Sequence, residues 1–344
     1  MTMVSVVMPI YNGEKYLSQA IESILAQTYT DFELIIVSEF GTNQASQAII
    51  EQYAKADNRI VVIENESRLG IAASLNRGLR AAKGEYIARM DGDDISLPQR
   101  LEKQVEFMDA NQDVAISCTR VSYIGENGKK LYYKDNLSED PDQIKADLLF
   151  FCFIHHPSVM FRKSAIFEHD LLYDESYTAA EDHELWCRAS RLVRIAAIPE
   201  VLLKYRWSRK SSYHTGGSVL DNHSRMILRR SLEDLHIPIN EEELSYLQRT
   251  TCRESILSYK SVEKSLNSYY NTISASNREF MIYDAKCLED TLNKRMYWKQ
   301  HRIRRLAAVI LKSAAKAASN DALFYAAIYL ELNGFAAVLK RIVF

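Results

Sequence analysis

The first 90 residues alternate between short β-branched runs and stretches with helical periodicity, and this alternation limits the fold more than any other feature of the sequence. The predicted strands are residues 4–8, 32–37, 60–63 and 86–90, and the predicted helices are residues 17–25, 44–56 and 71–82. Strands that alternate with helices form βαβ units around a mainly parallel sheet, and such sheets bind ligands beyond the carboxyl ends of their strands. The sequence therefore predicts an α/β fold with a site at residues 9–12, 38–41 and 91–94.

The second half of the chain has a less regular pattern. Short β-like pieces are expected at residues 114–117, 131–133, 159–161 and 201–207, with a helix at residues 181–190. From about residue 217 almost no Gly or Pro occurs, which favours helices to the end of the chain. The polar break at residues 213–218 separates the two patterns. We therefore expect an α/β domain over residues 1–215, followed by an α-helical region over residues 216–344.

Composition narrows the class of protein. The apolar fraction of 47% and the charged fraction of 26% are typical of a folded chain, and the net charge of −2 argues against a nucleic-acid partner. The five cysteines include no CxxC pair, so we expect a reduced, cytoplasmic protein without a zinc site of that kind. The short apolar segment before Glu14 and Lys15 predicts a first strand rather than a signal peptide, and no run of 18 uncharged apolar residues predicts a transmembrane helix.

Asp91-Gly92-Asp93-Asp94 is the strongest chemical signal, because it places three carboxylates directly after a predicted central strand. Such carboxylates repel one another, and a divalent cation relieves that repulsion. Mg²⁺ and Mn²⁺ prefer oxygen ligands, commonly one or two carboxylates together with substrate phosphates. The alternative is a solvated acidic turn, since Asp-Gly favours turns. Its position at the end of a strand favours the metal site.

Glu181-Asp182 opens the predicted helix of residues 181–190. Thr178 and Glu181 have the spacing of a capping box, which would give Glu181 a purely structural role. That interpretation does not account for Asp182, although the helix dipole favours an acidic residue in the first turn. The functional alternative makes Asp182 a general base that Glu181 and the helix end orient.

His155 and His156 precede a β-like run. Two adjacent histidines could line a pocket, but neighbouring residues of a strand point to opposite faces, so we do not expect both to bind one metal. The alternative is that both are structural histidines with satisfied hydrogen bonds.

These signals, in this order and spacing, resemble family 2 glycosyltransferases of the GT-A fold over about residues 1–215. The segments that carry the resemblance are Val6-Val7-Met8-Pro9-Ile10-Tyr11-Asn12; Gly70, Asn76, Gly78, Gly84 and Tyr86; the DxD-like Asp91-Gly92-Asp93-Asp94; Leu97-Pro98-Gln99-Arg100-Leu101; and Glu181-Asp182 with Leu185-Trp186. Each segment alone is a weak signal, whereas together and in order they are specific. The resemblance implies a GT-A nucleotide-diphospho-sugar transferase fold.

The resemblance also implies an activity: transfer of a sugar from a nucleotide-diphosphate sugar, UDP favoured, to a glycan or lipid-linked hydroxyl with inversion of configuration. The residues that it places at the donor are Pro9, Tyr11, Asn12, Glu39, Arg68, Asp91 and Asp93. Among them, Tyr11 and Glu39 would lie near the base, Asp91 would face the ribose, and Asp93, with Asp91, would hold Mn²⁺ or Mg²⁺. This metal would stabilise charge on the leaving group.

On the acceptor side, the resemblance makes Asp182 the catalytic base, with Glu181 as its partner. The acceptor-side candidates are His155, His156 and Trp186. Surface polysaccharide biosynthesis is the expected setting.

The chain departs from the family pattern at two places. Where the family usually has two Asp and then Gly-Ser, this chain has Ser38-Glu39-Phe40-Gly41, which bears on base recognition. Where the family often has a His after a Tyr-Arg pair, this chain has Ser208, and His214 is the alternative ligand.

Residues 297–344 carry eight Lys or Arg and two Asp or Glu, a net charge of +6 against −8 for the rest of the chain. The basic residues surround apolar positions in predicted helices. A basic helix with an apolar face can lie on an anionic membrane, and the alternative is a helical pair packed on the catalytic domain. We therefore expect a cytoplasmic protein, with peripheral contact at the inner face of the membrane as one of two alternatives.

Two other functions fit parts of the pattern. Nucleotidyl transfer also uses carboxylates and metals on an α/β sheet, but it favours a Gly-rich basic loop after the first strand, of which Asn12-Gly13-Glu14-Lys15 is a poor version. A catalytically inactive protein that binds sugar nucleotides is supported only by the altered run at residues 38–41.

Overall fold

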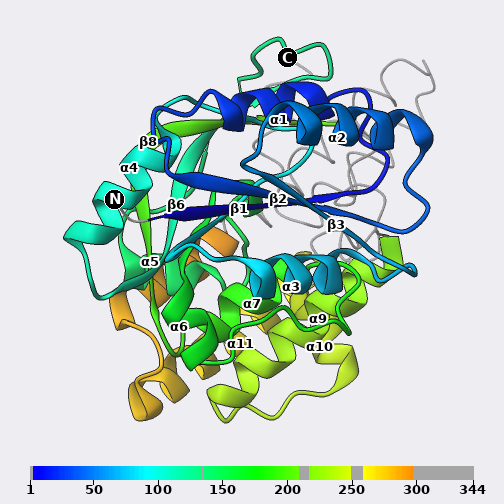
Figure 1. Ribbon diagram of the computed structural model, residues 1–344. Coiled ribbons are helices and arrows are strands. Elements are labelled where there is room, and N and C mark those ends of the chain that lie inside the picture. Colours follow the sequence, from blue (N-terminus) through cyan, green and yellow to red (C-terminus); the bar gives the residue numbers. More distant parts are fainter. Residues whose placement is uncertain (1–2, 133–134, 209–216, 249–258, 297–344) are drawn as a thin grey trace, which may run out of the picture. The chain divides into compact units, whose positions relative to one another are not determined.

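The computed structural model describes residues 3–132, 135–208, 217–248 and 259–296 (Figure 1). The chain divides into two compact units, Met1–Ile227 and Leu228–Phe344. The predicted domain boundary at residue 215, His214 and the basic segment of residues 297–344 lie outside the described residues.

One eight-stranded sheet organises the first unit. Its strands are β1 (Val4–Ile10), β2 (Phe32–Ser38), β3 (Ile60–Glu64), β4 (Tyr86–Arg89), β5 (Ile95–Ser96), β6 (Val114–Ile124), β7 (Met160–Arg162) and β8 (Arg194–Arg206). Their spatial order is β3-β2-β1-β4-β7-β6-β8-β5. The first four strands in this order are parallel, as are β6 and β8, whereas β7 is antiparallel to both neighbours and β5 is antiparallel to β8. The predicted mainly parallel α/β sheet is therefore confirmed.

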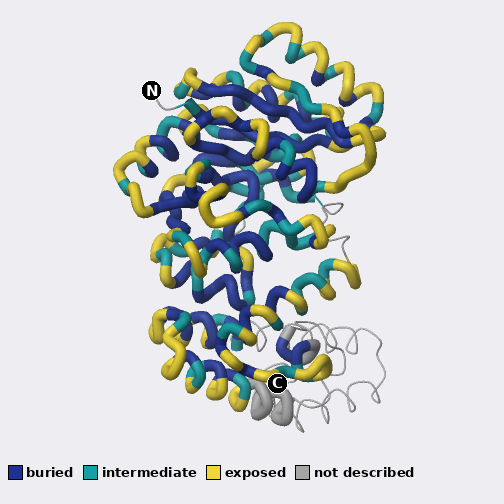
Figure 2. The backbone as a smooth tube through the Cα atoms, turned by 60° about the horizontal axis from the view of Figure 1, so that its bottom comes forward, coloured by how far each residue is buried: buried dark blue, intermediate teal, exposed yellow. Residues whose placement is uncertain are grey.

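Helices cover both faces of this sheet. They are α1 (Leu17–Leu25), α2 (Gln44–Ala56), α3 (Ile71–Ala81), α4 (Arg100–Ala110), α5 (Pro141–Asp147), α6 (Lys163–Glu168) and α7 (Glu181–Ala189), with a 3₁₀ turn η1 (His156–Ser158). Figure 1 shows α1 and α2 on one face of β1–β3 and α3 on the other. Because side chains alternate along a strand, Val6 and Met8 pack in the same apolar cluster as α1, and Val7 packs in the cluster of α3. The sheet is buried between these two layers, as the dark strands of Figure 2 show.

Strand β1 continues two residues beyond its predicted end, through Pro9. Pro9 lies opposite Val37 of β2, whereas the ladder to β4 ends at the pair of Val7 and Arg89. The Ile10 carbonyl accepts from an amide on the β2 side, so the neighbouring Pro9 directs its backbone nitrogen to the β4 side, beyond the end of that ladder. Proline is tolerated there because no ladder hydrogen bond is lost.

The predicted strand at residues 131–133 is wrong. Beyond β6 the chain turns at residues 126–128 and makes one isolated bridge, between Ile124 and Lys130, and residues 131 and 132 are not part of the sheet. The Leu131 amide donates to the Tyr123 carbonyl at 2.8 Å, so the segment contacts β6, but the pairing does not extend into a ladder.

The C-terminal region is helical, as predicted. Helix α9 (Gly217–Asp234) runs across the boundary between the two units, and α10 (Glu241–Gln248) and α11 (Tyr259–Phe280) follow. Within the second unit, the buried residues include Leu232, Leu244, Ile273 and Leu288. Among the helices of the described residues, none combines the length and the apolar character needed to cross a membrane.

Candidate active site

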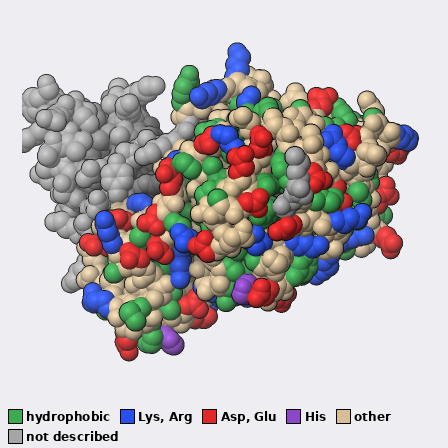
Figure 3. Space-filling model, turned by 60° about the vertical axis from the view of Figure 1, so that its left-hand side comes forward, with side chains coloured by type: hydrophobic (Ala, Val, Ile, Leu, Met, Phe, Trp, Pro, Cys, Tyr) green, Lys and Arg blue, Asp and Glu red, His purple; other side chains and the backbone are tan. Residues whose placement is uncertain are grey.

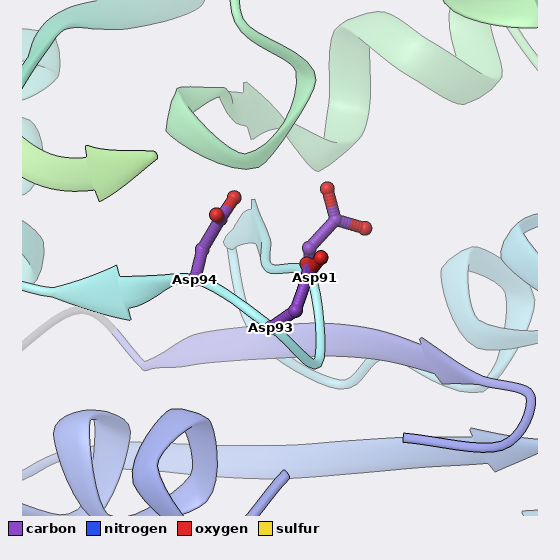
Figure 4. Close-up of side chains that lie close together, drawn as sticks. All are labelled: Asp91, Asp93 and Asp94. Carbon is purple, nitrogen blue, oxygen red and sulfur yellow. The ribbon is translucent and has the colours of Figure 1, made fainter. Parts of the chain in front are cut away.

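Three aspartates project from the loop between β4 and β5, and we call Asp91, Asp93 and Asp94 the acidic loop (Figure 4). One carboxylate oxygen from each lies within 4.8 Å of the others. Asp94 is buried, Asp91 is half-buried and Asp93 is exposed, so the group is open to solvent on one side. The loop leaves the carboxyl end of a central strand, which is where an α/β sheet binds ligands.

Arginine side chains surround the acidic loop, and the sequence pattern did not single out Arg89 or Arg206. Arg89, the last residue of β4, forms an ion pair with Asp91. The backbone amide of Arg206 donates to Asp94 Oδ1 at 2.6 Å, and its Nε donates to the Asp93 carbonyl at 2.7 Å. For Arg206 the signal is weak in the sequence, because the fold rather than local spacing brings it to Asp94, 112 residues earlier in the chain.

A third arginine, Arg100, is fully buried in α4 below the loop. Its Nη2 donates to the carbonyls of Arg89 at 2.8 Å and Val159 at 3.2 Å, and its Nε donates to Gln104 Oε1 at 2.9 Å. Burial, followed by the charge of Arg89, lowers the pKa of Arg100 to about 9. Arg100 therefore fixes the end of β4 to the segment that carries the two histidines.

The acidic loop favours protons or cations. Desolvation, followed by the Asp91 carboxylate, raises the pKa of Asp93 to about 6. Burial and the neighbouring carboxylates raise the pKa of Asp94 well above its usual range. Asp94 Oδ2 is buried and has no hydrogen-bond partner among the described residues. Clustered oxygen donors with an unsatisfied carboxylate oxygen are the donor set that Mg²⁺ or Mn²⁺ binds.

The second group of carboxylates is Glu181 and Asp182, which we call the helix pair because they open α7. The N-cap is Ala180 in the left-handed region (φ 58°), and no side chain caps the helix. The capping-box interpretation through Thr178 is therefore wrong, because the helix begins at Glu181. Asp182 Oδ1 accepts from the amide of His183 at 2.7 Å.

The helix pair is short of counter-charges. Burial, followed by repulsion from Asp182, raises the pKa of Glu181 to about 7. Burial also raises the pKa of Asp182. Arg89 is the cation that the two groups share: although burial opposes it, the carboxylates of Asp91 and Glu181 raise the pKa of Arg89. A carboxylate with a raised pKa at a helix start is suited to proton transfer.

The two adjacent histidines contact different partners. His156 is buried, its Nε2 lies 2.6 Å from the Tyr173 hydroxyl, and its Nδ1 lies 3.9 Å from Glu181 Oε1. His155 Nε2 lies 2.8 Å from the Tyr123 hydroxyl. Burial, followed by the charge of Arg89, holds the pKa of His156 well below its usual range. His156 is therefore a neutral neighbour of the helix pair.

The three acceptor-side candidates differ in burial. Trp186 is fully buried, and its ring stacks on Phe161 at a centroid distance of 5.7 Å. His156 is also buried, whereas His155 is partly exposed. A contact of any of the three with an acceptor stays a prediction.

Residues predicted to bind the nucleotide gather at the carboxyl ends of β1 and β2. The Tyr11 ring is exposed, and the Arg68 guanidinium lies over it, 4.8 Å from the centroid. Asn12 has a positive φ of 54°, and its Oδ1 accepts from the amide of Asn43 at 2.8 Å. Tyr11 and Arg68, which are far apart in the sequence, thus form one exposed aromatic and cationic surface.

The Glu39 carboxylate accepts hydrogen bonds from groups of the protein itself. Its carboxylate accepts from the backbone amides of Phe40 at 2.8 Å, Leu69 at 3.1 Å and Gly70 at 2.7 Å, and from the Asn65 side chain at 3.2 Å. Although burial opposes the shift, these hydrogen bonds lower the pKa of Glu39. Glu39 therefore holds the loop that carries Arg68 against the end of β2.

At the position of the family histidine, Ser208 Oγ lies 3.1 Å from Glu126 Oε1. On the face drawn in Figure 3, basic and acidic side chains are interspersed.

The known proteins similar to this chain are glycosyltransferases. The model of glycosyl transferase family 2 matches residues 5–168. An uncharacterized glycosyltransferase of Methanocaldococcus jannaschii is 40% identical over 216 residues, which are 61% of this chain and 73% of that protein. The O-antigen biosynthesis glycosyltransferase WbnJ of Escherichia coli is 36% identical over 217 residues, which are 61% of this chain and 82% of that protein.

The fold has a counterpart among solved structures. The crystal structure of S. aureus TarS 1–349 in complex with UDP-GlcNAc superposes with a TM-score of 0.59 and 17% sequence identity, covering 88% of this chain and 92% of that one. At this identity the likeness concerns the fold.

Proposed function

Because the chain belongs to glycosyl transferase family 2 and has the GT-A fold, we propose that it transfers a sugar from a nucleotide-diphosphate sugar to an acceptor hydroxyl with inversion of configuration. The observation that carries the proposal is the presence of two carboxylate groups with different surroundings, the acidic loop and the helix pair. One group is suited to a cation and the other to a proton, and metal-assisted inverting transfer needs both.

The acidic loop would hold Mn²⁺ or Mg²⁺ through Asp93 and Asp91. When bound, such a cation supplies positive charge that stabilises the leaving nucleoside diphosphate. The exposed surface of Tyr11 and Arg68 would receive the base, since an aromatic face and a guanidinium both stack on planar rings. UDP is the favoured nucleotide, which agrees with the ligand of TarS.

At the helix pair, Asp182 would take the proton of the acceptor hydroxyl. Its raised pKa, caused by burial, brings it closer to working pH and makes it a better base than an exposed aspartate. The oxygen would attack the anomeric carbon from the face opposite the diphosphate, the C–O bond to the diphosphate would break, and the proton would stay on Asp182. Glu181 and the neutral His156 would orient the base.

The relative that acts in O-antigen biosynthesis supports a polysaccharide or lipid-linked glycan as the acceptor. Peripheral membrane contact through the basic residues 297–344 is part of the proposal, because lipid-linked acceptors lie at a membrane. Deletion of these residues should release the protein from anionic vesicles, and unchanged binding would reject this part.

The test is a donor screen with purified protein and Mn²⁺. We expect one class of nucleotide sugar to give free nucleoside diphosphate, and Asp93→Ala to abolish the release while circular dichroism shows an unchanged fold. With an accepted hydroxyl acceptor, NMR of the new glycosidic bond should show an inverted anomeric centre. Release of pyrophosphate would indicate nucleotidyl transfer instead, and no turnover or binding of any donor would support an inactive protein.

A further inference from the structure

Arg89 is a buried cation aimed at the carboxylates proposed to hold a metal. Its side chain is 5% exposed and pairs with Asp91. Its Nε has no hydrogen-bond partner among the described residues. Its backbone is fixed on both sides, because its amide donates to the Val159 carbonyl at 2.9 Å and its carbonyl accepts from Arg100 at 2.8 Å. The backbone of Arg89 is therefore anchored, and its buried guanidinium pairs with Asp91.

One arginine already pairs with a carboxylate of the acidic loop before any cation arrives. The Arg89 guanidinium forms an ion pair with Asp91, whereas Arg206 contacts the loop through its backbone amide at Asp94 and through Nε at the Asp93 carbonyl. A divalent cation that entered alone would add two positive charges beside a fixed guanidinium. A nucleoside diphosphate would bring the negative charge that offsets them.

We propose that Arg89 acts as a counter-charge that keeps the affinity of the donor-free protein for a divalent cation low, so that cation and nucleoside diphosphate bind together. This inference rests on the proposed metal-dependent transfer and adds that the cation binds tightly only together with the nucleoside diphosphate. Arg89 pairs with one oxygen of Asp91 and would repel a cation held by the same carboxylate. Removal of the guanidinium should tighten Mn²⁺ binding to the donor-free protein by at least about tenfold.

The experiment measures Mn²⁺ binding from the electron paramagnetic resonance signal of the unbound ion, without donor sugar or turnover. The full-length wild type is compared with Arg89→Met, Arg89→Gln and the charge-retaining Arg89→Lys. Arg80→Met is the matched control, because Arg80 is an exposed residue in the last turn of α3 and its loss changes the net charge equally. We expect tighter binding in the two neutral variants, and binding like the wild type in Arg80→Met and nearly so in Arg89→Lys.

A second measurement begins with the wild type, so its first result does not depend on the folding of a variant. After the Mn²⁺ that the nucleotide binds in buffer is subtracted, UDP, or GDP if the donor screen selects it, should tighten Mn²⁺ binding by at least about tenfold. The same measurement in Arg89→Met should show a smaller coupling. Equal Mn²⁺ affinity with and without nucleotide, or a folded Arg89→Met that binds Mn²⁺ no better than the wild type, would overturn the inference. No binding of Mn²⁺ under any of these conditions would instead overturn the proposed metal site, so the two failures are distinguishable.

Discussion

The acidic loop and the helix pair are both clusters of carboxylates in the first unit, but their surroundings differ. The acidic loop contacts guanidinium or backbone groups of Arg89 and Arg206. The helix pair lies beside the neutral His156 and beside His183, whose amide donates to Asp182 and whose pKa is raised to about 9 although burial opposes the shift. Arg89 makes no hydrogen bond to the helix pair, and its positive charge alone acts on these carboxylates.

This difference separates two kinds of chemistry. In the acidic loop, Asp91 pairs with Arg89 and Asp93 is exposed to solvent, so these two carboxylates can exchange one cation for another. The carboxylates of the helix pair are raised in pKa mainly by burial, which penalises their charged form. We therefore expect changes in the acidic loop to alter the dependence on metal, and changes in the helix pair to alter the dependence on pH, with little crossover.

The largest effect is expected for Asp182→Asn. An amide keeps the shape of the side chain but cannot accept the proton of an acceptor hydroxyl, so turnover should fall by about 10²–10⁴. Mn²⁺ binding should be unchanged, and Tm should be equal or higher, because burial already disfavours the charge of Asp182. Steady-state kinetics and thermal unfolding check this. Full activity in a folded Asp182→Asn would mean that another group is the base.

Glu181→Gln should change the pH dependence more than the maximal rate. The wild-type rate should rise with pH around the apparent pKa of the pair, about 7 for Glu181, and the variant should reach its plateau at lower pH, because one of two mutually repelling carboxylates is gone. Profiles of kcat/KM from pH 5 to 9 measure this shift.

The pH dependence of stability gives an independent test of the raised pKa of Glu181. A folded-state pKa of about 7, above the ordinary value of 4.5, means that this group's favourable contribution is present below about pH 4.5 and is lost as pH rises to about 7. At pH 8, Glu181→Gln should therefore unfold at a higher temperature, by roughly 2–4 °C if about 1 kcal/mol is recovered. An unchanged Tm at pH 8 together with an unchanged profile would show that Glu181 titrates normally.

The sequence predicted the first half of the unit better than the second for a physical reason. A mostly apolar strand is followed by a periodic helix at each of β1, β2 and β3, so local pattern and final structure agree there. The short strand expected at residues 159–161 is found as β7, whereas the pattern around residue 131 predicted a strand where the structure has one isolated bridge to β6. Strand β8 begins at Arg194, seven residues before its predicted start. Local periodicity does not predict which distant segments pair as strands.

The same reason explains what the site prediction missed. The carboxylates of the acidic loop and the helix pair could be found from their positions at the ends of predicted elements. Their partners could not, because the Arg206 amide reaches Asp94 from 112 residues further along the chain. The cap of α7 was mispredicted because Ala180 adopts a left-handed conformation that the Thr178 spacing does not reveal. Contacts of buried charged groups with distant residues cannot be predicted from local sequence patterns.

Arg206→Met should weaken the acidic loop without touching the helix pair. The side chain donates to the Asp93 carbonyl at 2.7 Å and lies over the Tyr16 ring at 4.0 Å, so its loss should loosen the loop. The Mn²⁺ concentration for half-maximal activity should rise by about tenfold, the effect of roughly 1.4 kcal/mol, while the pH profile stays in place. Arg206→Lys should restore this only in part, because an ammonium lacks the planar fork.

A matched control for Arg206 is Arg59→Met, which removes an arginine paired with Asp57 before β3. It should lower stability slightly and leave the Mn²⁺ requirement alone. A shift in the pH profile of Arg206→Met that is as large as the shift in its Mn²⁺ requirement would show that the two carboxylate groups are not separable.

The smallest effect is expected for Glu39→Gln, which touches neither group of carboxylates. A glutamine would direct one N–H toward amides that now donate to Glu39, so the loop of Leu69 and Gly70 should loosen and stability should fall by about 1–3 kcal/mol. Because this loop carries Arg68, donor KM should rise by about tenfold or less for every donor, with kcat, Mn²⁺ requirement and pH profile unchanged. Glu33→Gln is the control, because Glu33 is a buried carboxylate of β2, the strand that Glu39 follows, and accepts from the Ser5 hydroxyl; this change should lower stability without raising KM. If Glu39→Gln instead changes the preference between UDP and GDP donors, the carboxylate reads the base directly, and its hydrogen bonds to the loop must rearrange when the donor binds.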